Sequence, residues 1–277
     1  MGEFRAPPSR ERGSRCWVTA RGSIAAIAAI DPGVADATFG SRSSIAIGGW
    51  PGSTTGRAWA SCERFAADVG AGTIQPEVEA VMYDPEAWEA TPDVERRDPI
   101  AAIGKFTSVA REHGYTPIIT PHPGLVHVAG AKIVRRAGET REGAYLRSGI
   151  SYAAAMNADL IEAQAQRLQR DPALYRPFVL ECALQARAAN PDVIVLSGLS
   201  THPGYRATPG MLFAAWESVR DVVDGHYLSL ARLRHPDVAA AFLRMVVEAG
   251  DGTAGECPEA AGVSVEAMHT ADPVVLS

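Results

Sequence analysis

Short apolar runs alternate along this chain with longer segments of helical periodicity, and this alternation is the feature that most limits the possible folds. Most runs end in Gly, Pro, Ser or an acidic residue, as in VEAVMYDPE and DVIVLSGLS. The runs lie at residues 23–33, 43–52, 78–86, 115–124, 158–166, 192–200 and 224–230. Strands that alternate with helices pair in parallel, and the helices form the crossovers.

The segments between the runs have apolar residues at helical spacing, and several carry start signals. They lie at residues 58–70, 99–113, 145–157, 175–189 and 209–223. Asp98 before Pro99 and Thr208 before Pro209 are typical of an N-cap residue followed by proline at the first helical position. The order of elements is therefore predicted by independent signals that agree.

Seven strand candidates, with an eighth near residues 16–20, favour a (β/α)₈ TIM-like barrel, irregular or incomplete at its N-terminus, in this 277-residue chain. A doubly wound open sheet is the alternative, but neither GxGxxG nor GxxxxGK[ST] follows the first strands. The expected organisation is a disordered or irregular N-terminal arm at 1–22 and a single barrel domain at 23–250. A C-terminal tail or small appended element is expected at 251–277.

Composition excludes several classes of partner. The chain is 47% hydrophobic and 21% charged, with a net charge of −6, which is typical of a soluble globular protein without a basic nucleic-acid-binding face. No stretch has the roughly 18 apolar residues of a membrane span. The four cysteines lack CxxC spacing, which argues against a structural zinc site. Secreted and cytoplasmic locations both stay open.

Polar and aromatic side chains gather where the predicted strands end, and in parallel α/β proteins these carboxyl ends hold the functional site. Aromatic rings that stack on a ring face, together with amides that bond hydroxyl groups, are typical of a site for a small molecule or an oligosaccharide. The candidate ligand-binding residues are Trp50, Tyr83, Trp88, His122, Gln164, Gln166, His226 and Tyr227.

Asp84 and Glu86 form an acid pair directly after one predicted strand, and they are the candidate catalytic residues. Because two nearby carboxylates resist joint ionisation, the pKa of one should rise toward the range of a general acid. A carboxylic acid of this kind protonates the oxygen of a glycosidic bond in glycoside hydrolases. The alternative is that the two acids cap a helix or form ion pairs with Arg96 or Arg97. Glu95 is expected to be a solvated loop acid.

The run SIAIGGWPG, the helix after it and VMYDPE together resemble the third and fourth strands of family 18 chitinase-like barrels. EAQAQ, VLSGLS and HYLSL are similar in position to later strands of that family. The family motif is DxxDxDxE, and Asp84-Pro85-Glu86 matches its final DxE. The resemblance implies that Glu86 is the proton donor, that Asp84 is its partner, and that Tyr83 and Gln164 line a sugar site.

Two further hypotheses stay open. One is a metal-dependent lyase, isomerase or hydrolase that binds Mg²⁺, Mn²⁺ or Zn²⁺ through Asp84, Glu86, His122 and Glu162, because oxygen and imidazole ligands suit these ions. The other is a non-catalytic barrel that binds a glycan or a protein. The glycoside hydrolase hypothesis itself needs no cofactor and no metal ion.

Overall fold

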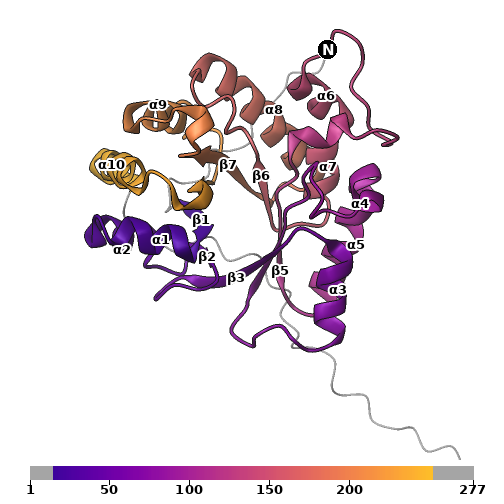
Figure 1. Cartoon of the computed structure of the whole chain (residues 1–277), viewed down its shortest axis with the longest axis horizontal. Coiled ribbons are helices and arrows are strands. Elements are labelled where there is room, and N and C mark those ends of the chain that lie inside the picture. Colours follow the sequence, from indigo (N-terminus) through magenta and orange to yellow (C-terminus); the bar gives the residue numbers. More distant parts are fainter. Residues whose placement is uncertain (1–14, 252–277) are drawn as a thin grey trace, which may run out of the picture.

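Eight parallel strands form a closed barrel in this computed structural model, which describes residues 15–251 (Figure 1). Each strand pairs with the next in sequence, and the last pairs with the first through Cys16 opposite Gly225. Among the described residues a helix follows every strand except β2, which leads directly into β3, and the helices surround the barrel. The predicted (β/α)₈ fold is confirmed, and residues 1–14 and 252–277 of the predicted arm and tail lie outside the described part.

The strands of the described chain are β1 (Cys16–Ala20), β2 (Ile45–Ile47), β3 (Thr54–Trp59), β4 (Ala80–Tyr83), β5 (Thr116–Ile119), β6 (Leu160–Ala163), β7 (Ile194–Ser200) and β8 (Gly225–Ser229). The α-helices are α1 (Arg21–Ala28), α2 (Pro32–Phe39), α3 (Cys62–Gly70), α4 (Asp93–Arg97), α5 (Pro99–Glu112), α6 (Arg141–Ser148), α7 (Ile150–Ala155), α8 (Pro172–Ala189), α9 (Pro209–Val219) and α10 (Pro236–Val246). Short 3₁₀ turns occur at η1 (Pro123–His127), η2 (Pro203–Tyr205) and η3 (Ala231–Leu233), and η4 (Val247–Asp251) follows α10.

One predicted strand is a helix in the structure, and one strand of the barrel was not predicted. Residues 24–30 lie mainly in helix α1, where Ile24 and Ile27 are buried one turn apart. A short run of Ile and Ala has no periodicity that separates a strand from a buried helix, and Ala favours the helix. The strand near residues 16–20 exists as β1, so the barrel begins inside the segment assigned to the arm. Strand β3 takes the start of the helix predicted at 58–70, and α3 begins only after its N-cap Ser61.

The helix start signals agree with the structure. The side chain of Asp98 accepts a hydrogen bond from the Ala101 backbone N–H at the start of α5, and the side chain of Thr208 does the same for Met211 in α9. The helix predicted at 145–157 is divided into α6 and α7 by Gly149, which has a left-handed φ of 69°. No helix among the described residues is long and apolar enough to cross a membrane.

Alternate residues of each strand face two different cores. The residues that face into the barrel form a small apolar cluster that includes Val18, Met82, Ile118, Leu160 and Leu196. Their neighbours in sequence point outward and pack with the helices in a larger cluster. Because successive side chains of a strand point to opposite faces, this parity also fixes which side chains can reach the mouth of the barrel.

Candidate functional site

A polar cavity of about 90 Å³ opens where the strands end. Strands β4, β5, β6 and β8, or the residues directly after them, supply its lining. The lining residues are Asp84, Glu86, Thr120, Glu162, Gln164, Gln166, Tyr227 and Ser229. All of them carry hydroxyl, amide or carboxyl groups, and none is Lys, Arg or His.

Strand parity explains how these side chains come together. Met82 of β4 and Leu160 of β6 face into the barrel, so Asp84 and Glu162, each two residues further along, face the same way. Ile118 of β5 directs Thr120 to the cavity in the same manner. Two acids and Thr120 therefore continue the inward-facing rows of β4, β5 and β6 beyond the apolar interior.

Asp84 is held by two donors from the neighbouring strands. Its Oδ1 accepts a hydrogen bond from Thr120 Oγ1 at 2.8 Å and one from Gln164 Nε2 at 3.0 Å. The Gln164 amide also donates to the backbone carbonyl of Thr120 at 2.6 Å. Burial raises the pKa of the Asp84 carboxyl, while the hydrogen bonds from Thr120 and Gln164 lower it. The net direction is upward, so this acid resists ionisation.

Glu162 is a second buried acid on the floor of the cavity. Its Oε1 accepts a hydrogen bond from Gln166 Nε2 at 2.7 Å. Burial raises its pKa well above the ordinary value, and the charges of Asp84 and Glu86 raise it further. Gly198 of β7 makes room for this pair, because a Cβ at position 198 would lie 2.3 Å from Glu162 Oε1 and 2.4 Å from Gln166 Nε2.

Glu86 differs from the other two acids in having no hydrogen bond to its carboxyl group within the described residues. Its backbone N–H donates to Thr91 Oγ1 at 3.1 Å, which fixes the main chain and leaves the carboxyl facing the cavity. Burial, followed by the charge of Asp84, raises the pKa of Glu86 to about 7. This group therefore exists in both protonation states near neutral pH, as a general acid–base requires.

The negative charge of the cavity is not balanced by the arginines that the sequence suggested. Arg96 and Arg97 both form ion pairs with Asp93 on α4. The alternative that Asp84 and Glu86 pair with these arginines is therefore wrong. The opposite cavity wall carries Tyr227, whose pKa is raised by burial and by the three acids, so that its phenol stays protonated and can donate a hydrogen bond.

Two residues predicted to bind substrate face the opposite side of their strands. Tyr83 is buried among the outer core residues, and its hydroxyl donates to Glu95 Oε2 at 2.7 Å. His226 is fully buried, and its Nδ1 shares a hydrogen bond of 2.8 Å with Ser197 Oγ. Tyr83 is next to Met82 and His226 is next to Tyr227, and because Met82 and Tyr227 face inward, Tyr83 and His226 point toward the helices. The structure therefore does not bring either side chain into the cavity, and substrate binding by these two residues stays a prediction.

Three more predicted residues lie outside the cavity. Trp50, in the loop after β2, packs half-buried against the outer core. Trp88, in the loop before α4, is 51% exposed. His122 uses its Nδ1 to accept the backbone N–H of Gly124 and so caps the turn η1. Strand β5 ends at Ile119, and the chain turns before His122 can continue the inward row.

Sequence reasoning missed the roles of Ser229 and Glu95. Ser229 lines the cavity two residues after Tyr227 on β8, and strand parity alone could have found it. Glu95 is only 4% exposed, and it accepts hydrogen bonds from Ser61 Oγ, Tyr83 Oη and the backbone N–H groups of Cys62 and Glu63. The prediction of a solvated loop acid is wrong, because Glu95 closes the start of α3 from another helix, and no local pattern signals such a contact.

The proposed metal-ligand set does not assemble as predicted. His122 is absent from the cavity, so Asp84, Glu86 and Glu162 are the only members of that set that line it. Among residues 15–251, no group of three or more His, Cys, Asp or Glu side chains is placed to hold a metal ion. The arrangement can instead hold protons, because three carboxyl groups with raised pKa values share one cavity.

No protein-family model matches the sequence, and neither does any curated protein. Among solved structures, the chain is similar to a Burkholderia cenocepacia J2315 protein assigned as a phosphonomutase, with 15% identity, a TM-score of 0.41 and coverage of 86% of this chain and 93% of that chain. It is also similar to wild-type GGGPS from Thermoplasma volcanium, with 10% identity, a TM-score of 0.40 and coverage of 86% and 92%.

The resemblance to family 18 chitinases is wrong. No family model supports it, and the two similar structures named above are an assigned phosphonomutase and GGGPS rather than chitinases. The cavity agrees with this correction, because Trp50 and Trp88 do not line it and Tyr227 is its only aromatic residue among those described. The roles that the resemblance implied for Tyr83 and for a sugar-stacking surface are withdrawn with it.

Proposed function

We propose that the protein is an enzyme of the lyase, isomerase or hydrolase class that uses Glu86 as a general acid–base on a small polar substrate. The observation that carries this proposal is the Glu86 carboxyl itself. It faces the cavity without a hydrogen-bond partner among the described residues, and its pKa is raised to about 7 by burial and by Asp84. A group with a pKa near the working pH transfers protons in both directions most effectively.

The other two acids have distinct parts in this proposal. Asp84 is held beside Glu86 by hydrogen bonds from Thr120 and Gln164. When the Asp84 carboxyl is ionised, its charge favours the protonated form of Glu86. Glu162 is the most deeply buried acid, and its raised pKa favours the neutral carboxyl, which can donate a hydrogen bond to a substrate oxygen. Tyr227 adds a phenol donor on the opposite wall.

The cavity limits the part of the substrate that reacts. A volume of about 90 Å³ corresponds to roughly three water molecules at about 30 Å³ each. It therefore admits a few heavy atoms, such as one hydroxylated or carbonyl-bearing end of a molecule. The lining offers no basic side chain to pair with an anionic group, and such a group would be repelled by any of the acids that is ionised. The reacting end of the substrate is therefore neutral or cationic.

A divalent cation is the second candidate for balancing these acids. The observation in its favour is that Asp84, Glu86 and Glu162 line one cavity with no basic side chain among the lining residues, because carboxylate and amide oxygens are the ligands that Mg²⁺ and Mn²⁺ prefer. Binding would require the acid side chains to rotate toward one point, since no ready cluster of three ligands exists in the described chain. His122 has no part in this version.

Turnover of a panel of small hydroxy-carbonyl compounds and polyols, followed by NMR, tests the proposal. Glu86→Gln keeps the shape and removes proton transfer, so we expect a rate loss of about 10²-fold or more. Glu89→Gln is the matched control, because Glu89 lies in the same loop and is exposed. Turnover that is equal in both variants contradicts the proposal. If activity is lost in the presence of a chelator and is restored by Mg²⁺ or Mn²⁺, the second candidate, a divalent cation bound by these acids, is supported.

A further inference from the structure

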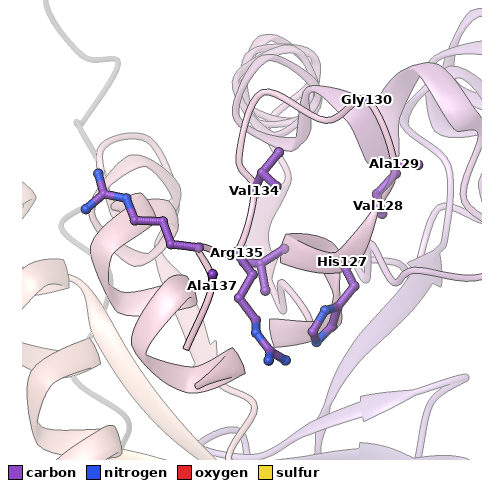
Figure 2. A pocket seen from close by; sticks show the side chains of 9 residues that line it. His127, Val128, Ala129, Gly130, Val134, Arg135 and Ala137 are labelled. Carbon is purple, nitrogen blue, oxygen red and sulfur yellow. The ribbon is translucent and has the colours of Figure 1, made fainter. Parts of the chain in front are cut away.

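A second, larger cavity lies in the long connection between β5 and α6. It has a volume of about 380 Å³ and is lined by residues 126–130 and 134–137 (Figure 2). The two segments are joined by a hydrogen bond from the Arg135 backbone N–H to the Val126 carbonyl at 3.2 Å. The connection therefore folds back on itself and encloses a space, although it has no regular secondary structure beyond η1.

The ionisable side chains of this second cavity are all nitrogen bases, and none is an acid. They are His127, Arg135 and Arg136, and Figure 2 shows the side chains of His127 and Arg135 projecting in the same direction. Within residues 15–251, none of the three side chains has a hydrogen bond or an ion pair. The neighbouring arginines do have partners, since Arg141 pairs with Glu142 and Arg147 pairs with Glu139.

The same connection begins at the acid cavity. The His122 backbone N–H donates to the carbonyl of Pro85, which lies between Asp84 and Glu86. His122 is neutral near pH 7, because burial, followed by the charges of Arg141 and Arg167, lowers its pKa to about 4. A single stretch of chain thus leads from an acidic cavity, through a neutral imidazole, to a basic cavity at the same end of the barrel.

We propose that the second cavity binds the anionic group of the substrate, a phosphate, sulfate or carboxylate, while the neutral end of the same molecule reacts beside Glu86. This inference rests on the proposed function for its substrate. Guanidinium groups bind such anions with two parallel hydrogen bonds, and two unpaired arginines are available. The difference between the two cavities orients the molecule, because the anion is attracted by the arginines and finds no basic side chain in the acid cavity.

Calorimetric titration with inorganic phosphate, sulfate and malonate tests the anion site without a known substrate. The double variant Arg135→Gln/Arg136→Gln should bind the preferred anion at least ten-fold more weakly than the unchanged protein. The matched control is Arg64→Gln/Lys105→Gln, which removes two charges from exposed positions on α3 and α5 and should bind within two-fold of the unchanged protein. Equal melting temperatures of the two double variants show that both remain folded.

A second titration compares glycerol 3-phosphate with glycerol, and binding of the phosphate ester alone is expected. The inference is overturned if no anion binds, or if the Arg135/Arg136 variant and the unchanged protein bind anions equally. Titration of Glu86→Gln separates the two proposals, because anion binding should persist in that variant. If anions bind but no turnover depends on Glu86, the anion site is supported and the proposed function is contradicted.

Discussion

Replacing Glu86 by Gln should stabilise the protein at alkaline pH and have little effect at acidic pH. The carboxyl has an ordinary pKa of 4.5, and folding raises it to about 7. Between these values the folded state binds a proton that the unfolded state has released. The stability associated with this group is therefore fully present below pH 4.5 and is lost as the pH rises to about 7.

The size of the effect follows from the rise in pKa. At 1.36 kcal/mol per pKa unit, a rise from 4.5 to about 7 corresponds to roughly 3 kcal/mol. Glu86 is partly open to solvent, which screens its charge, so we expect about 1.5–2 kcal/mol. Gln carries no charge at any of these pH values, so Glu86→Gln should be more stable than the unchanged protein by this amount at pH 8.5.

Urea unfolding followed by tryptophan fluorescence at pH 5 and pH 8.5 measures the difference. The exposed Glu89→Gln control should show no pH-dependent change relative to the unchanged protein. If Glu86→Gln changes the free energy of unfolding by the same amount at both pH values, the raised pKa is refuted, and the general acid–base role loses its basis.

Two other substitutions test the supports of the site. Glu95→Ala leaves the buried donors of Cys62 and Tyr83 without an acceptor. It should therefore lower the free energy of unfolding, measured by urea titration, by about 3–5 kcal/mol. A loss below about 1 kcal/mol contradicts the contacts described. Gln164→Leu removes one donor from Asp84 and should raise the pKa of that acid further. The acidic limb of the pH–rate profile should then move to higher pH, and an unchanged profile would show that this hydrogen bond does not tune the reaction.

The barrel could be predicted from sequence because its signals are local and repeated. Apolar runs with polar ends identify β4 to β8, and caps such as Asp98 and Thr208 mark the helix starts. The number of strands is right for a partly wrong reason. One predicted strand is α1, and β3 was missed: residues 54–57 were assigned to no element and the last two residues of the strand to a helix, because a stretch containing Gly56 and Arg57 lacks the continuous apolar character of a buried strand.

Only those site residues could be predicted from sequence that continue the alternation of inward-facing and outward-facing side chains along a strand. Asp84, Gln164 and Tyr227 come together because each continues an inward-facing row, whereas Tyr83 and His226 occupy the other parity. Parity ends where a strand ends, so nothing in the sequence showed that the chain turns away at His122. The burial of Glu95 could not be predicted for another reason. Its partners lie at the start of α3 and on β4, and such contacts depend on how the elements pack.

Gly198 couples the acid site to a strand that contributes no residue to the cavity lining. A Cβ at this position would collide with the ends of the Glu162 and Gln166 side chains, so a larger residue on β7 requires these two side chains to move and disturbs the hydrogen bond between them. A substitution on β7 can therefore displace the buried acid of β6 while every residue of the cavity lining stays the same.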